Sequence, residues 1–268
     1  MGKKYSIEEN GIATSYMLDL TPPEHLDDRH CHDMYEILFV LQGDGRYIVE
    51  GSYYDIKPGT LMVIRPFEYH CVEVDSCKPY ERYVINFRDT SLADDALMLL
   101  NSFMSTGDDT SGKFYSLQTK SRLILSLFER FEDSQSLPKI EQGIFMKMLL
   151  SELIVLLSAS DGETLVKDDV ELGARVIKYL NEHIDRDITL DKLAKRFFVS
   201  KYYLCRAFKK HNGISVHGYV NQKRVMYAKQ LIESGETASG AAYRVGFGDY
   251  SAFYRAYVKV LGKSPTAD

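Results

Sequence analysis

The first third of the chain has the hydrophobic period of β-strands. Short apolar runs rich in β-forming residues occupy positions 35–41, 46–50, 61–66 and 80–87. Glycine and proline lie between these runs, as in the GDG of residues 43–45. Short strands separated by turns at regular spacing are typical of a sandwich or a small barrel. We therefore predict an N-terminal β-domain.

The period then changes to that of helices. Apolar residues in 115–133 recur at spacings of three and four, which predicts a helix. Pro138 opens a second predicted helix that runs to Ser160, because proline suits the first turn. The centre of this helix, residues 148–157, is apolar nearly all round, so it must be buried on more than one side. Packing on the barrel and pairing with a second subunit would each satisfy this requirement.

A polar, acidic stretch separates two halves of opposite charge. Residues 158–169 read as a linker, and only helical patterns follow it. Residues 1–169 hold 16 Lys and Arg against 29 Asp and Glu, a net −13, whereas residues 170–268 hold 17 against 9, a net +8. A basic region attracts a polyanion that an acidic region repels. The halves are therefore expected to have separate roles, although the whole chain carries −5.

Several classes of protein are disfavoured by what the sequence lacks. No run of eighteen apolar residues is present, and the first residues contain no apolar signal segment. The four cysteines form no C-x-x-C pair and are too few for a disulfide framework. We expect a cytoplasmic protein that does not enter a membrane. Glycine-rich phosphate loops, nucleophile elbows and H-E-x-x-H zinc sites are also absent from the sequence.

The basic half contains an internal repeat at an offset of 49 residues. Ser200 overlays Asp249, and both are good N-caps; Gly213 overlays Gly262, where a helix needs a left-handed residue. A shorter helical pattern precedes each copy, which gives two helix-turn-helix motifs. The amphipathic segment 218–235 joins them as a stiff spacer. Such a spacer lets one subunit read two successive major grooves, about 34 Å apart.

Residues 176–265 resemble the DNA-binding domain of the AraC/XylS family of transcription regulators. The resemblance is carried by residues 193–235 and 243–265, most specifically by Val245-Gly246-Phe247 and the closing Gly262-Lys-Ser-Pro265. It implies that the base-facing residues are Tyr202, Cys205 and Arg206 in the first motif, with Lys201 close by, and Tyr250, Ser251, Tyr254 and Arg255 in the second.

Two of these positions carry the predicted sequence readout. Arg206 and Arg255 can each make a bidentate contact to guanine, although the matching arginine in this family can instead hold structure or phosphate. Other basic residues are expected to neutralise phosphate or to lie solvated on the surface. These are Lys209, Lys210, Lys223, Arg224 and Lys259.

The strand region resembles the cupin barrel and the sensor domains of AraC-type regulators over residues 17–87. The motif is His30-x-His32-x₃-Glu36-x₆-Gly43, followed by Pro66 and His70. Strand alternation would place residues 30, 32 and 36 on one face. We predict a ligand-binding site of His30, His32, Glu36, Arg46 and His70.

The chemistry of this site has three interpretations. Three imidazoles and a carboxylate suit Zn²⁺, Mn²⁺, Fe²⁺ or Ni²⁺, so His30, His32, Glu36 and His70 are candidate metal ligands. The same groups can hydrogen-bond the hydroxyls of a small polar ligand without any cofactor. They can also be satisfied polar groups in the barrel mouth.

These observations predict a multidomain α+β protein. The expected parts are a cupin-like barrel (1–100), a helical dimerisation segment (101–160), a linker (161–172) and a DNA-binding domain (173–268). The function we infer is a homodimeric, non-enzymatic regulator, in the commoner case an activator. Its partners would be an operator in double-stranded DNA, RNA polymerase and a small effector such as a sugar. The alternatives are a metal-dependent cupin enzyme with a DNA-binding domain, and a ligand-independent regulator whose barrel is a dimerisation scaffold.

Overall fold

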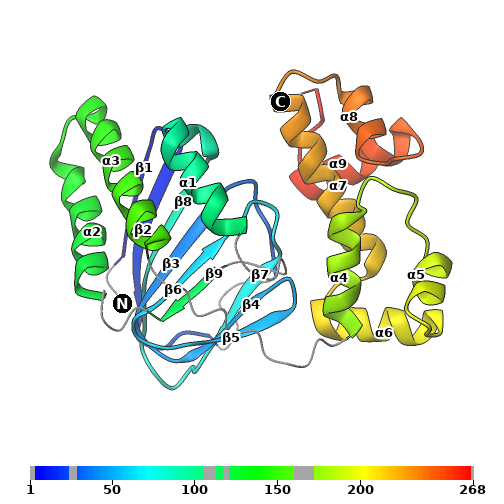
Figure 1. The fold of residues 1–268 in the computed structure, drawn as a ribbon, viewed down its shortest axis with the longest axis horizontal. Coiled ribbons are helices and arrows are strands. Elements are labelled where there is room, and N and C mark those ends of the chain that lie inside the picture. Colours follow the sequence, from blue (N-terminus) through cyan, green and yellow to red (C-terminus); the bar gives the residue numbers. More distant parts are fainter. Residues whose placement is uncertain (1–3, 24–28, 106–112, 117–120, 160–171, 267–268) are drawn as a thin grey trace. The chain divides into compact units, whose positions relative to one another are not determined.

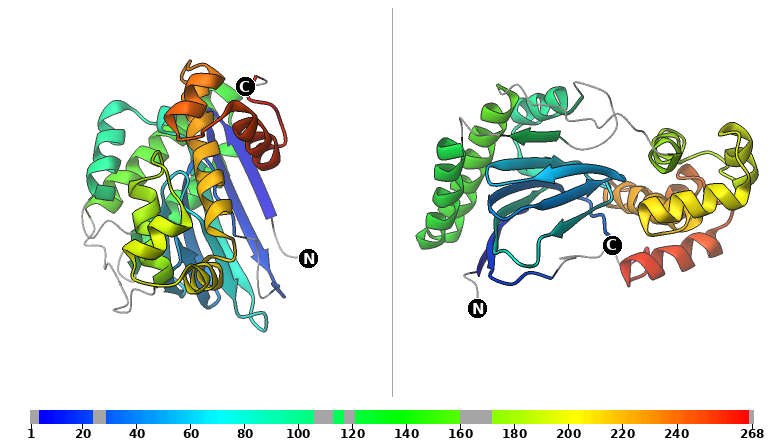
Figure 2. Two further views of the ribbon diagram at one scale, coloured as in Figure 1. Left: turned by 90° about the vertical axis from the view of Figure 1, so that its right-hand side faces the viewer. Right: turned by 90° about the horizontal axis from the view of Figure 1, so that it is seen from below.

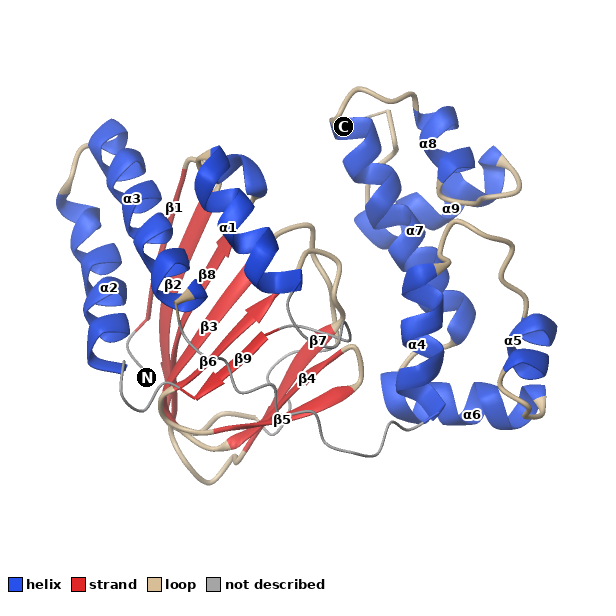
Figure 3. Cartoon of the chain, in the orientation of Figure 1, coloured by secondary structure: helices blue, strands red, loops and turns tan. Residues whose placement is uncertain are grey.

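The computed structural model describes residues 4–23, 29–105, 113–116, 121–159 and 172–266. It divides into two compact units, Met1–Val166 and Lys167–Asp268. The first unit combines antiparallel sheets with helices, and the described part of the second is helical (Figures 1 and 3). The predicted α+β class is confirmed. No helix in the described ranges is both long enough and apolar enough to cross a membrane.

Two antiparallel sheets form the body of the first unit. The larger has the strand order β1-β2-β8-β3-β6-β9, and the smaller has the order β5-β4-β7. The larger sheet comprises β1 (Lys4–Glu9), β2 (Ile12–Asp19), β3 (Tyr35–Gln42), β6 (Thr60–Ile64), β8 (Tyr80–Phe87) and β9 (Lys113–Ser116). The smaller comprises β4 (Gly45–Val49), β5 (Ser52–Ile56) and β7 (His70–Val74).

The larger sheet is apolar on both faces. In β3, Ile37 and Phe39 belong to a core shared with helices, whereas Leu38 and Val40 belong to a core shared with the smaller sheet. Strand β6 divides its side chains in the same way. Because each face has its own cover, the run 37–41 is continuously apolar instead of alternating.

Three helices supply the cover on one face (Figure 3). These are α1 (Asp94–Ser105), α2 (Ser121–Asp133) and α3 (Lys139–Ser158), with short 3₁₀ turns at Asp89–Ser91 and Ser134–Ser136. Phe128 of α2 stacks on Phe39 and on Tyr83, with ring centroids 5.4 and 4.9 Å apart. The helix predicted from Pro138 is confirmed, with Pro138 as its N-cap.

The helix predicted over 115–133 begins too early. Residues 113–116 form β9, which pairs with β6 so that Tyr115 lies opposite Leu61. The helical spacing holds only from Ser121 onward. The boundary predicted at residue 100 falls inside α1, and β9 returns to the sheet after it. Of the linker predicted at 161–172, all but Leu172 lies outside the described residues.

Strands β1, β2, β5 and β7 were not predicted. β5 has the sequence SYYDI, which lies between Gly51 and Pro58 and contains no continuous apolar run. β7 has the sequence HCVEV and is mostly buried. Its histidine and glutamate interrupt the apolar pattern, so the sequence does not show it as a buried strand. Both strands pair with β4 in the smaller sheet. Local hydrophobic pattern therefore failed to reveal the short strands of the smaller sheet, β5 and β7, as well as the N-terminal strands β1 and β2.

The helical unit contains the predicted repeat. Its elements are α4 (Leu172–Glu182), α5 (Leu190–Arg196), α6 (Lys201–Asn212), α7 (Val216–Glu233), α8 (Ala238–Arg244) and α9 (Tyr250–Leu261). The Ser200 side chain accepts from the Tyr203 amide at 3.2 Å, and that of Asp249 accepts from the Ala252 amide at 2.7 Å. Gly213 and Gly262 end α6 and α9 with φ of 76° and 71°. The predicted caps are confirmed.

Helix α7 packs on both motifs (Figures 1 and 2). Toward its C-terminal end, Val225 and Ala228 join a core with α8 and α9. Toward its N-terminal end, Tyr219 is fully buried, and its ring meets that of Phe208 in α6 edge-on at 5.7 Å. The spacer is therefore part of the core of each motif.

The two motifs differ in the turn before the second helix. Gly246 takes the left-handed position after α8 with φ of 91°, whereas Phe198 takes it after α5 with φ of 55°. The amide three residues after each short helix closes the turn, Val199 to Ala194 O and Phe247 to Ala242 O, both at 3.0 Å. Phe198 is 94% exposed, so it holds a conformation unfavourable for a side chain without packing in return.

We expect Phe198→Gly to raise the free energy of unfolding of the helical unit by about 1 kcal/mol, since glycine is unstrained at positive φ. Thermal and urea unfolding followed by circular dichroism would measure it. Gly246→Ala is the opposite control, because an added Cβ would lie 2.5 Å from the Asp185 carbonyl oxygen. A Phe198→Gly protein no more stable than the parent would show that this turn is not strained.

Candidate functional site

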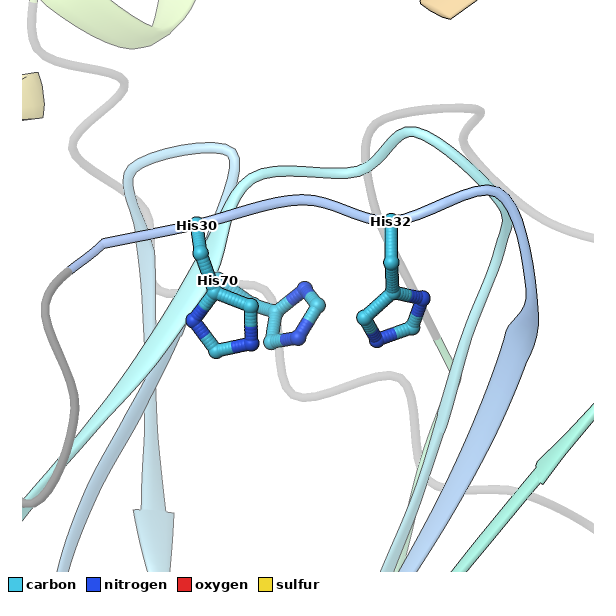
Figure 4. A group of neighbouring side chains, drawn as sticks. All are labelled: His30, His32 and His70. Carbon is cyan, nitrogen blue, oxygen red and sulfur yellow. The ribbon is translucent and has the colours of Figure 1, made fainter. Parts of the chain in front are cut away.

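Three histidines meet in the first unit. The backbone of His30 pairs with that of His70 at the start of β7, with reciprocal N–H···O bonds of 3.1 and 2.9 Å, and the Phe67 amide donates to His32 O at 2.7 Å. The His70 ring centroid lies 4.5 Å from that of His30 and 5.0 Å from that of His32. Figure 4 shows the three rings directed to the same side of these two segments.

Glu36 of β3 joins the histidines from the larger sheet. Its carboxylate Oε2 lies 3.3 Å from His32 Nε2 and 3.8 Å from His70 Nε2. The Tyr47 hydroxyl of β4 donates to Oε1 at 2.6 Å. Glu36 shares the face of β3 with Leu38 and Val40, which looks toward the smaller sheet. The site therefore lies where the two sheets meet.

The predicted reason for this convergence was wrong in part. His30 and His32 precede β3 and do not share a strand face with Glu36. They reach it because residues 30–32 run alongside 67–70, so that tertiary pairing takes the place of strand alternation. The sequence reasoning also missed Tyr47, whose signal would have been the alternation of β4.

Arg46 lies apart from the cluster. Neighbouring residues of a strand face opposite sides, and Tyr47 is the one that points to Glu36. The Arg46 side chain is 56% exposed and pairs with Glu73 at 3.5 Å. The structure thus brings together His30, His32, Glu36 and His70 of the predicted ligand set, without Arg46. Cys31, next to two of the histidines in the sequence, is half-buried, whereas Cys71 is buried.

The charges of the cluster are set by the buried carboxylate. Burial acts to raise the pKa of Glu36, but His70, His32 and Tyr47 outweigh it and lower this pKa to about 2. Burial lowers the pKa of His70, with Glu36 opposing. For His32, burial is outweighed by the hydrogen bond and charge of Glu36, so its pKa is raised. Glu36 is therefore ionised and His70 neutral at pH 7.

Two imidazoles are oriented as metal ligands usually are. His32 Nδ1 lies 3.0 Å from Met34 O and His70 Nδ1 lies 2.8 Å from Glu68 O, so each ring turns Nε2 toward Glu36. Backbone carbonyls commonly hold metal-ligating histidines in this way. His70 Nε2 is buried without a hydrogen-bond partner. One ligand nitrogen from each of the three histidines can lie within 4.8 Å of the other two. The donor set fits a divalent transition metal, and it equally offers hydrogen-bonding groups to a polar ligand.

The recognition helices expose the residues predicted to face bases. Leu204 and Phe208 bury one face of α6, and Phe253 and Tyr257 bury the matching face of α9. The opposite faces expose Tyr202, Arg206, Lys209, Ser251, Tyr254 and Arg255, while Cys205 is half-buried. Lys201 and Tyr250 are exposed in the first turn of each helix, on the side of the buried residues, because they precede Leu204 and Phe253 by three positions. Lys201 pairs with Asp191 of α5 at 2.7 Å. At the offset of 49 residues the two exposed faces share an arginine, Arg206 matching Arg255, while the residues beside them differ.

Two basic residues of α7 do not lie where the sequence suggested. Lys223 is 2% exposed, with its ammonium 5.4 Å from the centre of the Tyr219 ring. The Arg224 guanidinium is half-buried and donates to two backbone carbonyls. The local pattern of charges in the sequence does not predict which segments pack against these two side chains. Neither residue is a solvated surface charge, so the electrostatic attraction for DNA must come from other lysines and arginines.

Comparison with known families gives two matches. The family described as "AraC-like ligand binding domain" matches residues 13–154. The family described as "Helix-turn-helix domain" matches residues 193–267. The first match covers the histidine cluster and α1 to α3, and the second covers the stretch from α5 to α9. Together the two matches span most of the chain.

Individual relatives agree with these matches. The HTH-type transcriptional activator RhaS of Salmonella schwarzengrund is 26% identical over 255 residues, which cover 91% of this chain and 87% of the relative. RhaS of Salmonella typhimurium is 25% identical over the same shares. Among solved structures, ToxT from Vibrio cholerae is 13% identical, with 97% of each chain covered and a TM-score of 0.41.

If the cluster holds a divalent ion, adding Zn²⁺, Mn²⁺, Fe²⁺ or Ni²⁺ at 100 times its Kd should stabilise the fold by about 2.7 kcal/mol. Thermal unfolding and elemental analysis of the dialysed protein would measure this. Glu36→Gln and His70→Ala should lose both the stabilisation and the bound ion. Glu73→Gln, which changes a carboxylate paired with Arg46 on the outer side of β4 and β7, should keep both. Were none of the ions to bind, the cluster would not be a metal site.

Proposed function

Because the chain belongs to the AraC family of transcription regulators, we propose that it controls transcription in response to a small molecule bound at the histidine cluster. The comparisons agree with the predicted resemblance: a ligand-binding region precedes a helix-turn-helix region. The observation that carries the DNA-binding part is the pair of matched helices, each capped by a side chain and ended by glycine, on one rigid spacer.

DNA reading rests on these two exposed helix faces. A helix of this kind lies in the major groove with its first residues against base edges. Arg206 and Arg255 occupy matching positions and are exposed, as a bidentate contact to guanine requires. Lys209 and Lys259 lie near the helix ends and are exposed, which suits contacts to phosphate. Each protomer would span two successive grooves.

The effector is proposed to be small and polar, with a sugar as the favoured class. The cluster presents imidazole nitrogens and a carboxylate, which pair well with hydroxyl groups. Tyr47 holds the carboxylate in place from the facing sheet. The relatives named above are transcription regulators, and we propose that the barrel senses its ligand and has no catalytic role.

Dimerisation is proposed to use the outer stripe of α3. Met146, Leu149, Leu150 and Leu153 are buried against the sheet side, but four other apolar residues are exposed. Ile140, Ile144, Met148 and Val155 are 76, 57, 63 and 52% exposed. At 100° per residue they lie in a stripe about 80° wide, which suits a second copy of the same helix. Pairing would raise the effective concentration of the second DNA-binding unit.

The remaining partners follow from this role. A regulator of this kind acts on operator DNA in the cytoplasm and works through RNA polymerase. The RhaS relatives are transcriptional activators, and we propose activation here too. Ligand binding would favour one arrangement of the paired DNA-binding units over another, since a ligand shifts an equilibrium only by its difference in affinity for the two states.

The DNA contact can be tested by selection from random duplexes with the whole chain. We expect wild-type protein to select one motif and to protect two successive grooves per protomer. Arg255→Ala should lose about 1–3 kcal/mol at one base pair and accept other bases there. Arg244→Ala removes an exposed arginine that pairs with Glu236 at 2.7 Å, and it should leave base preference intact.

Two results would contradict this assignment. An Arg255→Ala protein with the parental base preference would exclude Arg255 from base readout. Protection of a single groove per protomer would exclude simultaneous reading by both motifs.

The dimer surface has its own test. Met148→Glu should shift a dimeric protein to monomer at micromolar concentration, because a charge would have to be buried in the apolar contact. Sedimentation velocity would measure the change. Met98→Glu is a matched control, since Met98 of α1 is 71% exposed and lies outside the stripe. If both variants stayed dimeric, or if the parent were monomeric, the stripe would not be the pairing surface.

A further inference from the structure

Arg224 lies near the middle of α7, where the two helix-turn-helix motifs adjoin. Its Nε donates to Ile184 O at 2.8 Å, and its Nη2 donates to Arg186 O at 2.6 Å. Both carbonyls belong to the turn between α4 and α5, which leads into the first motif. One guanidinium therefore serves as donor to two backbone carbonyls in a turn that is neither helix nor strand.

The same guanidinium touches the second motif. Its Cζ lies 5.8 Å from the centre of the Phe247 ring, in the turn between α8 and α9. Gly246 of that turn approaches so closely that an added Cβ would be 2.8 Å from Arg224 Nη2 and 2.5 Å from Asp185 O. The α4–α5 turn and the α8–α9 turn thus lie against each other around Arg224.

Packing on helix α7 does not by itself determine how the α4–α5 turn and the α8–α9 turn are placed relative to each other. The helix packs on the first motif through Tyr219 and on the second through Val225 and Ala228, at different ends. Apolar contacts of this kind are not directional. Two hydrogen bonds from a planar fork fix both distance and angle. The turn before α9 sets where that recognition helix begins.

We propose that Arg224 is a positioning residue that fixes the separation and relative orientation of the two recognition helices. Arg224 couples the turn before α5 to the turn before α9 and touches no DNA itself. Its role is to restrict the protein to DNA in which the two half-sites have one spacing. The inference rests on the proposed reading of two grooves by one protomer.

The experiment measures affinity against half-site spacing. The probes are duplexes selected by the wild-type chain, with one base pair added or removed between the two contacted segments. Each base pair shifts the second segment by about 3.4 Å and turns it by about 35°. Wild-type protein should lose on the order of tenfold in affinity at either changed spacing.

Arg224→Gln should flatten this profile, so that the loss at changed spacing falls to about threefold or less, while the base preference of each half-site persists. Arg224→Lys keeps the charge but lacks the fork, and it should flatten the profile likewise. Arg244→Ala is the charge-matched control away from the junction and should keep the wild-type profile. Thermal unfolding of each variant identifies any that fails to fold, and Arg224→Lys then decides the matter.

A variant that binds more weakly at every spacing by the same factor would show that Arg224 only stabilises the unit, and the proposal would be overturned. Failure of the wild-type chain to select any DNA would instead overturn the proposed function. If the affinity of the wild-type protein did not change with half-site spacing, the proposal would be overturned, while sequence-specific binding by each motif would still stand. The three failures are therefore distinguishable.

Discussion

The larger sheet has two apolar faces, and the need to cover both organises the first unit. Helices α1 to α3 bury one face and the smaller sheet buries the other. Covering the second face places β4 against β3, so that Tyr47 can hold Glu36. Covering the first face fixes α3 with one side buried, which leaves its outer stripe of apolar residues exposed. The sensor site and the proposed dimer surface thus come from the same packing requirement, on opposite sides of one sheet.

The helical unit solves a different problem, which is to keep two small motifs in register. Neither motif has a large core of its own, and residues of α7 complete the core of each. Apolar packing binds the motifs to the spacer, while directional bonds from Arg224 determine how the turns meet. Burial lowers the pKa of Arg224, and Asp187 and Asp185 oppose this, so the guanidinium stays charged at neutral pH. The sequence pattern predicts Arg224 as a surface charge, whereas in the structure its guanidinium is half-buried and hydrogen-bonded to the backbone.

The geometry of the histidine cluster suits more than one kind of occupant. A buried carboxylate held ionised beside a neutral imidazole can accept a metal or a hydroxyl-rich ligand. Both uses require the fixed orientation that the carbonyls of Met34 and Glu68 impose on the rings. The preorganisation of the site is therefore common to every interpretation, and only the occupant differs.

Local pattern in the sequence was sufficient for the repeat, its caps, the spacer helix and the strands β3, β4, β6 and β8, because caps and amphipathic periods act within a few residues. It also identified His30, His32, Glu36 and His70, since the motif spacing resembles a known barrel. Short strands such as β5 and β7 escaped, because their stability comes from pairing with β4 and not from their own residues. The outward facing of Arg46, the burial of Lys223 and the junction at Arg224 were decided only by tertiary structure. Each depends on which distant segment lies alongside, and that information is not local to any stretch of the chain.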